Sequence, residues 1–253
     1  MNRPAESSAP YTRPETVAVT VGRPPHAAGA PFNPPVQFAS TYVGGADLDA
    51  TIGYGRDGNP TWTALEEAVG TLEGGAALTF ASGMAASQAV LELVEPGATV
   101  VLPRTCYLGV AAAVDARASR YGWSVRRVDV ADTEAVLAAA DGADLVWLES
   151  PTNPLIEVAD LPRIGQELTG RVRLVVDNTF ATPLLQRPLE HGASLVVHSM
   201  TKLLSGHSDV LLGAVVVPPA DTATLADLAG IRQAFGAVPG PMEAYLSLRG
   251  LRT

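Results

Sequence analysis

The fold is decided by residues 172–202, which read VRLVVDNTFATPLLQRPLEHGASLVVHSMTK. Two apolar runs in this stretch, Val172–Val176 and Ser194–Val197, have the length and composition of buried strands, and polar residues follow each of them. Runs of the same kind recur along the chain, and helical patterns separate them. This alternation predicts an α/β fold in which helices cover both faces of a mainly parallel sheet. The other expected strands are Ala76–Phe80, Thr99–Leu102, Val125–Val130, Asp144–Leu148 and Leu211–Val217.

Helical patterns lie between these strands and before the first of them. One helix is expected to open at residues 59–61, Asn-Pro-Thr, because proline is favoured in a first helical turn. Residues 1–60 are predicted to be an extended N-terminal arm that contacts a partner subunit, since proline pairs at 24–25 and 34–35 interrupt regular structure. Residues 61–253 would then be the large domain. The other expected helices are Met84–Val94, Leu108–Ser119, Thr133–Ala140 and Leu161–Leu168.

The composition limits the classes of protein to which the chain can belong. Its 253 residues are 47% hydrophobic and 17% charged, which suits one large core. The net charge of −9, without a basic cluster, argues against nucleic acid or an anionic membrane as a partner. No apolar run approaches the length that spans a membrane. The single cysteine, Cys106, excludes an intrachain disulfide and favours the cytoplasm.

Two familiar kinds of site are not expected. Residues 53–58 match the dinucleotide-binding pattern G-x-G-x-x-G, but residues 46–52 do not make a convincing strand before it, so we interpret the match as accidental. None of the four histidines has zinc-ligand spacing to a second His or Cys, so no metal site is expected.

Lysine occurs once, at position 202, whereas arginine occurs sixteen times. Arginine can replace lysine in ion pairs and phosphate contacts, but its guanidinium stays protonated and cannot form a Schiff base. A lone lysine is more often a solvated surface residue. Lys202, however, follows an expected buried strand and lies beside Ser199 and Thr201, whose hydroxyls could bind a phosphate. The pattern therefore favours a functional amine.

Three further segments follow expected strands, at the edge where a parallel sheet places its ligands. Ser82 and Gly83 open a helix whose N-terminus suits a phosphate, although an ordinary capped turn has the same pattern. Asp177 could pair with a pyridinium nitrogen or cap a turn. Tyr107 could stack on a ring and assist proton transfer, or pack in the core. Together with Lys202, these residues indicate a site for pyridoxal 5′-phosphate.

Seven segments, in order along the chain, closely resemble the Cys/Met-metabolism enzymes, which depend on pyridoxal phosphate (PLP) and include cystathionine γ-synthase-like enzymes. The resemblance runs from about Thr16 to Thr253. It implies the large domain of the aspartate-aminotransferase fold, which is fold type I of the PLP-dependent enzymes. The segments are 54–61 (YGRDGNPT), 81–86 (ASGMAA), 149–154 (ESPTNP), 176–180 (VDNTF), 198–202 (HSMTK), 206–209 (GHSD) and 249–253 (RGLRT).

The resemblance implies a role for each matching residue of the site. Lys202 would form the Schiff base and move protons, Asp177 would pair with the pyridine nitrogen, and Tyr107 would stack on the ring. Asn153 would lie near the ring hydroxyl and the substrate. The phosphate would be held by Ser82, Gly83, Met84, Ser199 and Thr201, and Thr179 would also contact the cofactor.

The same resemblance implies an oligomer and a second domain. Tyr54 and Arg56 would reach the cofactor phosphate of a neighbouring subunit, which requires a homo-oligomer, usually a dimer of dimers. Members of the family continue past the segment 249–253 into a C-terminal small domain, which carries the arginine that binds the substrate carboxylate. That domain is expected to be absent from this sequence.

The implied activity is trans-sulfuration, in the biosynthesis of methionine from cysteine. A cystathionine γ-synthase would replace the γ-substituent of an activated homoserine ester with cysteine to give cystathionine. A cystathionine γ-lyase or a homoserine-ester sulfhydrylase would use the same site, so both stay open. A further alternative is a chain that binds PLP without activity of its own.

Overall fold

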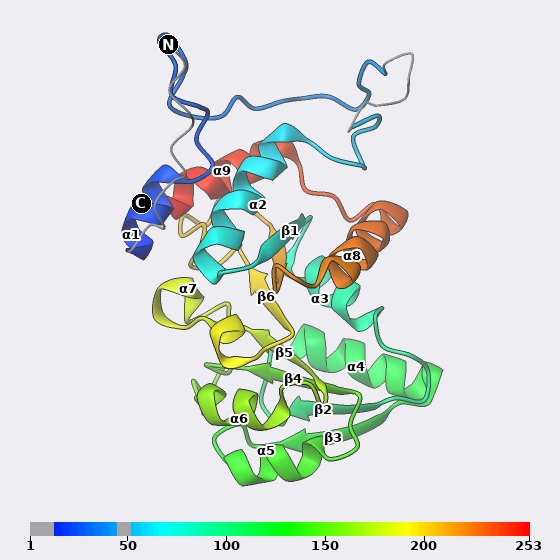
Figure 1. Ribbon diagram of the computed structural model, residues 1–253. Coiled ribbons are helices and arrows are strands. Elements are labelled where there is room, and N and C mark those ends of the chain that lie inside the picture. Colours follow the sequence, from blue (N-terminus) through cyan, green and yellow to red (C-terminus); the bar gives the residue numbers. More distant parts are fainter. Residues whose placement is uncertain (1–12, 45–51) are drawn as a thin grey trace.

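The computed structural model describes residues 13–44 and 52–253, and its centre is a seven-stranded sheet (Figure 1). The strands lie in the order β1-β7-β6-β5-β4-β2-β3. All of the expected strands are present, and their ends lie within two residues of the predicted ones. The strands are β1 (Ala76–Phe80), β2 (Thr99–Pro103), β3 (Ser124–Val128), β4 (Leu145–Glu149), β5 (Arg173–Asp177), β6 (Leu195–Ser199) and β7 (Gly213–Val217).

The sheet is mainly parallel, as predicted. Strands β3, β2, β4, β5 and β6 pair in parallel, and Glu149 at the end of β4 is the register partner of Asp177 at the end of β5. Strand β7 runs antiparallel to both of its neighbours, β6 and β1. The other six strands therefore share one direction, and their carboxyl ends reach the same edge of the sheet.

Helices cover both faces of the sheet and bury its apolar side chains. Helices α3 (Gly83–Leu91), α4 (Leu108–Tyr121) and α8 (Thr222–Phe235) pack on one face. Helices α1, α2 and α9 cover β6 and β7 on the other face. On that same face, α5 and α6 cover β5, β4, β2 and β3. These and the short helices are α1 (Pro14–Thr20), α2 (Pro60–Glu73), α5 (Thr133–Ala140), α6 (Leu161–Leu168), α7 (Thr182–Leu185), the 3₁₀ helix η1 (Pro188–His191) and α9 (Pro241–Leu251).

The helix expected at residues 59–61 has the predicted start. Asn59 caps α2 by accepting a 2.8 Å hydrogen bond from the Thr61 amide, and Pro60 occupies the first helical position. Gly74 ends the helix with a left-handed φ of 81°, which lets the chain turn back into β1. Trp62 and Leu65 bury one side of α2 against the sheet.

The prediction of an extended arm is wrong for Pro14–Thr20, which form α1. Val17 and Ala18 are buried in the cluster shared with α2 and α9, so tertiary packing stabilises a seven-residue helix that the local proline signals did not indicate. The first twelve residues of the expected arm, and residues 46–51 before the G-x-G-x-x-G match, lie outside the described residues. The contact of the arm with a partner subunit stays a prediction.

Two other properties concern the described part of the chain. None of its helices combines the length and the hydrophobicity needed to cross a membrane. Within the same residues, no three His, Cys, Asp or Glu side chains come together as metal ligands could.

Two helical glycines test how tightly the layers pack. A Cβ at Gly165 in α6 would lie 1.6 Å from the backbone oxygen of His191, whereas a Cβ at Gly230 in α8 would meet nothing within 4 Å. We expect Gly165→Ala to lower the free energy of unfolding by about 1–3 kcal/mol through overpacking. Gly230→Ala should raise it by about 0.5–1 kcal/mol, because alanine is the better helix former. Urea denaturation of both variants measures this, and equal stabilisation by both would contradict the close contact of α6 with η1.

Candidate active site

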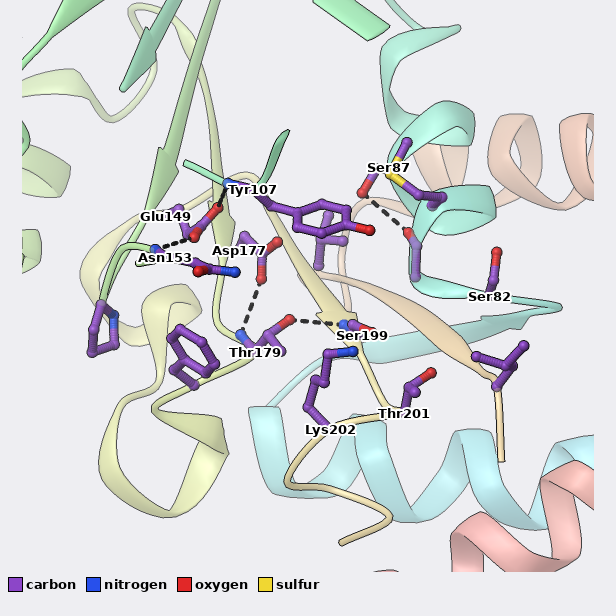
Figure 2. Close-up of a pocket in the computed structure, with 16 residues that line it drawn as sticks. Ser82, Ser87, Tyr107, Glu149, Asn153, Asp177, Thr179, Ser199, Thr201 and Lys202 are labelled. Carbon is purple, nitrogen blue, oxygen red and sulfur yellow. Dashed lines mark hydrogen bonds between the residues drawn. The ribbon is translucent and has the colours of Figure 1, made fainter. Parts of the chain in front are cut away.

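A pocket lies at the carboxyl edge of the sheet, where the ends of several strands meet (Figure 2). Its cavity is about 210 Å³. Most of the residues that line it end β1, β2, β4, β5 or β6 or lie in the connections that follow these strands. Ten of the twelve residues expected to contact the cofactor line it: Ser82, Gly83, Met84, Tyr107, Asn153, Asp177, Thr179, Ser199, Thr201 and Lys202.

One side of the pocket is the N-terminus of α3. Ser82 caps this helix by accepting a 3.1 Å hydrogen bond from the Ala85 amide, so its hydroxyl proton stays available to a ligand. The amides of Gly83 and Met84 belong to the first turn and have no acceptor within the helix. A Cβ on Gly83 would lie 2.7 Å from Cβ of Ser199, so glycine is required for the approach of α3 to β6. This side of the pocket suits a phosphate.

The hydroxyl residues after β6 differ in how they are engaged. The Thr201 hydroxyl donates to the backbone oxygen of Leu212 over 3.2 Å and accepts from the Leu212 amide over 3.0 Å. It would therefore have to leave the Leu212 oxygen in order to donate to a phosphate. The Ser199 amide donates to the Thr179 hydroxyl over 2.8 Å, which joins the ends of β5 and β6. Ser82 and Ser199 are thus better prepared than Thr201 to hold an anion.

Asp177 lies across the pocket at the end of β5. Its Oδ1 accepts a 3.0 Å hydrogen bond from the Thr179 amide, and the side chain is buried. Among the described residues no Lys, Arg or His lies within ion-pair distance of this carboxylate. Burial raises the pKa of Asp177, and its hydrogen bonds with Thr179 oppose that shift. The carboxylate would be stabilised by a cationic ring nitrogen within the pocket.

The amine and the aromatic ring both line the pocket. The side chain of Lys202 points into it from the turn after β6, and Figure 2 shows the ring of Tyr107 over the same space. A Cβ at Gly109 would lie 2.7 Å from Cε1 of the Tyr107 ring, so the lack of a side chain at position 109 lets the ring take this orientation. Tyr107 is 45% exposed, which argues against the alternative that it packs in the core.

Glu149, for which the sequence patterns predicted no role, ends β4 beside Asp177 and also lines the pocket. Its carboxylate accepts hydrogen bonds from the amides of Tyr107 (2.8 Å) and Asn153 (2.6 Å). Burial and the adjacent Asp177 raise the pKa of Glu149 to about 7. An acidic residue at the end of an apolar strand had pointed to Asp177, and the same signal could have identified Glu149. Burial and, to a smaller extent, the nearby Glu149 raise the pKa of the Cys106 thiol to about 12, which disfavours the reactive thiolate.

A buried polar cluster behind the pocket joins its strands to α2. Oε1 of Glu73 lies 2.7 Å from Nε2 of His198 and accepts a 2.8 Å hydrogen bond from the Asn178 amide group. All three side chains are fully buried. Gln186 donates to Oδ1 of Asn178 and to the backbone oxygen of Ser150. His198, Asn178 and Ser150 each directly adjoin a residue of the pocket, so the cluster fixes the ends of β4, β5 and β6.

Tyr54 and Arg56 do not line the pocket of their own chain. Tyr54 is 46% exposed, and the Arg56 guanidinium lies 5.2 Å from the centre of its ring. Arg56 also donates a 2.9 Å hydrogen bond to the backbone oxygen of Gln233 in α8. Their expected contact with the cofactor of a neighbouring subunit stays a prediction.

The comparisons with known proteins agree with this geometry. Residues 15–253 match the model of the family described as Cys/Met metabolism PLP-dependent enzyme. The chain belongs to this family. It is 42% identical over 246 residues to a cystathionine gamma-synthase of Mycobacterium bovis, and 43% identical over 245 residues to a putative cystathionine gamma-lyase of Streptomyces coelicolor. These alignments cover 95% and 94% of this chain, but only 63% and 62% of the two relatives.

A solved structure shows the same fold. The crystal structure of metB from Corynebacterium glutamicum superposes with a TM-score of 0.90 at 36% sequence identity, over 97% of this chain and 65% of that one. The fold-type-I large domain expected from the sequence is thereby confirmed. The chain spans about 63% of the length of the curated relatives that it matches.

The residues of the pocket fit the cofactor on which this family depends. The close approach of Gly83 to Ser199 leaves a cradle of amides and hydroxyls for a phosphate. Asp177 supplies a buried carboxylate that lacks an ion-pair partner among the described residues, and Lys202 supplies the amine. An aromatic face, an acid, an amine and an anion site thus surround one small cavity.

The buried carboxylate of Asp177 leads to a prediction about stability and pH. Because its pKa is raised by folding, the ionised form opposes folding above the folded-state pKa, and protonation relieves the penalty as the pH falls through that value. We expect Asp177→Asn to stabilise the cofactor-free protein at neutral pH, with a smaller gain on acidification. Urea denaturation at several pH values measures the difference.

The same variant is expected to bind PLP at least tenfold more weakly, since it loses the charge that would pair with the ring nitrogen. A loss of stability at neutral pH with unchanged affinity would contradict the assignment of Asp177.

Proposed function

We propose that the chain holds PLP in this pocket and carries out trans-sulfuration of the cystathionine γ-synthase type. The observation that carries the proposal is the position of Lys202. It is the only lysine of the sequence, and its side chain points into a pocket that has an anion cradle on one side and Asp177 on the other. The ordinary alternative is a solvated surface lysine, whose side chain would point into solvent and away from these groups.

Each residue then has a chemical task. Lys202 would supply the amine for the cofactor aldehyde and would move protons between substrate carbons, which a guanidinium could not do because it stays protonated. Asp177 would hold a proton on the ring nitrogen, and Tyr107 would cover the ring face. The N-terminus of α3, with Ser82 and Ser199, holds the phosphate. When bound, PLP acts as the electron sink for a substrate carbanion.

The proposed substrates are an activated homoserine ester and cysteine, with cystathionine as the product. A cystathionine γ-lyase or a homoserine-ester sulfhydrylase would place the same chemical groups in this pocket, and the names of the relatives include both synthase and lyase. The difference among these activities lies in what contacts the substrate side chain. We propose the synthase first because several of the similar relatives carry that name.

A second proposal is that these 253 residues bind PLP without turnover of their own. It is motivated by the lining of the pocket, which includes no arginine among the described residues and so offers no guanidinium for a substrate carboxylate. The expected oligomer, with Tyr54 and Arg56 reaching a neighbouring cofactor, belongs to the proposal as well.

The role of Lys202 can be tested by trapping. With PLP added, the wild-type chain should turn yellow, and borohydride should fix the cofactor to the peptide that contains Lys202. The only other amine of the chain is its N-terminal amino group, so peptide mapping leaves little ambiguity. Lys202→Arg keeps the positive charge and should lose both the yellow band and the label, as should Lys202→Ala. Labelling that persists in either variant would show that the cofactor is bound elsewhere.

The reaction can be tested by two separate assays of the PLP-loaded chain. A synthase should form cystathionine from O-succinylhomoserine and cysteine, because cysteine replaces the γ-leaving group. Production of only 2-oxobutyrate and cysteine from cystathionine would refute the synthase assignment in favour of a lyase. A chain that binds PLP but is inactive in both assays would support the second proposal.

A further inference from the structure

Glu149 is a buried carboxylate of the pocket to which the proposed chemistry gives no task. It ends β4, which lies between β5 and β2 in the sheet, and only 4% of its surface is exposed. Asp177, its register partner on β5, places a second carboxylate at the same level of the pocket. Two neighbouring carboxylates in a buried site repel each other, so a second one is unfavourable unless its negative charge has a structural or chemical role.

The two oxygens of Glu149 bind two different loops. Oε2 accepts a hydrogen bond of 2.8 Å from the amide of Tyr107, which precedes α4 in the connection after β2. Oε1 accepts one of 2.6 Å from the amide of Asn153, in the connection between β4 and α6. A carboxylate can accept at both oxygens at once, whereas a neutral amide side chain offers only one acceptor and would turn a donor toward the other N–H.

The two anchored residues are those whose side chains face the middle of the pocket. Figure 2 shows the Tyr107 ring and the Asn153 side chain extending from Glu149 toward Asp177, each from a backbone that Glu149 holds. A simple structural anchor of the loops could be provided by a neutral group at lower electrostatic cost. A carboxylate at this position is explained if the main chains of Tyr107 and Asn153 must be held by the same side chain.

We propose that Glu149 is a positioning residue for the cofactor ring, which acts by holding the main chains of Tyr107 and Asn153, whose side chains line the cavity. This inference rests on the proposed binding of PLP in the pocket. It extends that proposal, because it assigns the orientation of the ring to a residue that need not touch it.

The charge of Glu149 depends on the groups that surround it. Asp177 on β5 and Cys106 beside Tyr107 are the titratable neighbours, and Lys202 and Tyr107 line the same cavity. Burial and Asp177 raise the pKa of Glu149 to about 7 in the cofactor-free chain. The hydrogen bonds that its two oxygens accept from the Tyr107 and Asn153 amides therefore weaken as the carboxylate becomes protonated. The orientation of the ring should then depend on pH.

The test compares Glu149→Gln with Glu157→Gln, in the PLP-loaded full chain. Glu157 is a matched control because it lies in the same loop, where it binds Thr152, and does not line the pocket. The affinity for PLP is measured by titration, and the orientation of the bound ring by circular dichroism in the visible range. We expect Glu149→Gln to bind PLP about tenfold or more weakly, with a smaller dichroic signal per bound cofactor. Glu157→Gln should resemble the wild type.

The pH profile separates positioning from mere loop stability. In the PLP-loaded wild type, protonation of Glu149 at falling pH should change the visible dichroism, and Glu149→Gln should remove that component of the pH profile. A residue that only stabilised the loops would lower the urea midpoint but leave the dichroism per bound cofactor and its pH profile as in the wild type. Such a result would overturn the inference.

A third variant keeps the test decisive should Glu149→Gln not fold. Glu149→Asp keeps the charge but is one methylene too short to reach both amides, so it is expected to fold and to bind PLP at least threefold more weakly, with altered dichroism. Wild-type affinity and dichroism in Glu149→Asp would overturn the inference. If the wild type itself shows no cofactor band, the proposed function has failed; if the wild type binds and all variants match it, only the role of Glu149 has failed.

Discussion

The shared direction of six strands is the constraint on which the site depends. Because every strand except β7 runs the same way, the residues that end or follow them arrive at one edge of the sheet. The cap of α3, the ring of Tyr107, two carboxylates and the segment 199–202 are far apart in sequence, and the strand directions alone bring them to one pocket. The reversed strand β7 contributes its beginning instead, which is why Leu211 also lines the cavity.

Strand direction places these residues at one edge of the sheet, but buried polar contacts fix the positions of the strand ends relative to one another. Glu73 at the end of α2 binds His198 and Asn178, and Gln186 extends the cluster to Ser150. The side chains of Glu73, His198 and Asn178 are fully buried, so breaking a contact among these three would leave an unpaired polar group in the core. The apolar layers and the polar cluster thus have separate tasks: the former hold the sheet together, and the latter sets the geometry of its edge.

Most of the sheet could be predicted from the sequence, because its strands are continuous apolar runs that end in polar residues. The pocket residues Ser82, Asp177 and Lys202 follow such runs, and the topology then brings them together. Helix α1 could not be predicted in this way, since its stability comes from packing on α2 and α9 and not from its own sequence. The bond between Glu149 and the Tyr107 amide joins residues 42 positions apart through a main-chain donor, which leaves no mark in residue types.

The single lysine has a practical consequence for handling the protein. Acylating reagents such as succinimidyl esters, and resins that couple through primary amines, have Lys202 and the N-terminal amino group as their only targets. Fluorescent labelling or immobilisation by this common chemistry would therefore modify the pocket itself, while the sixteen arginines, which carry most of the positive charge, would remain untouched. Attachment through carboxylates or an affinity tag leaves the pocket free.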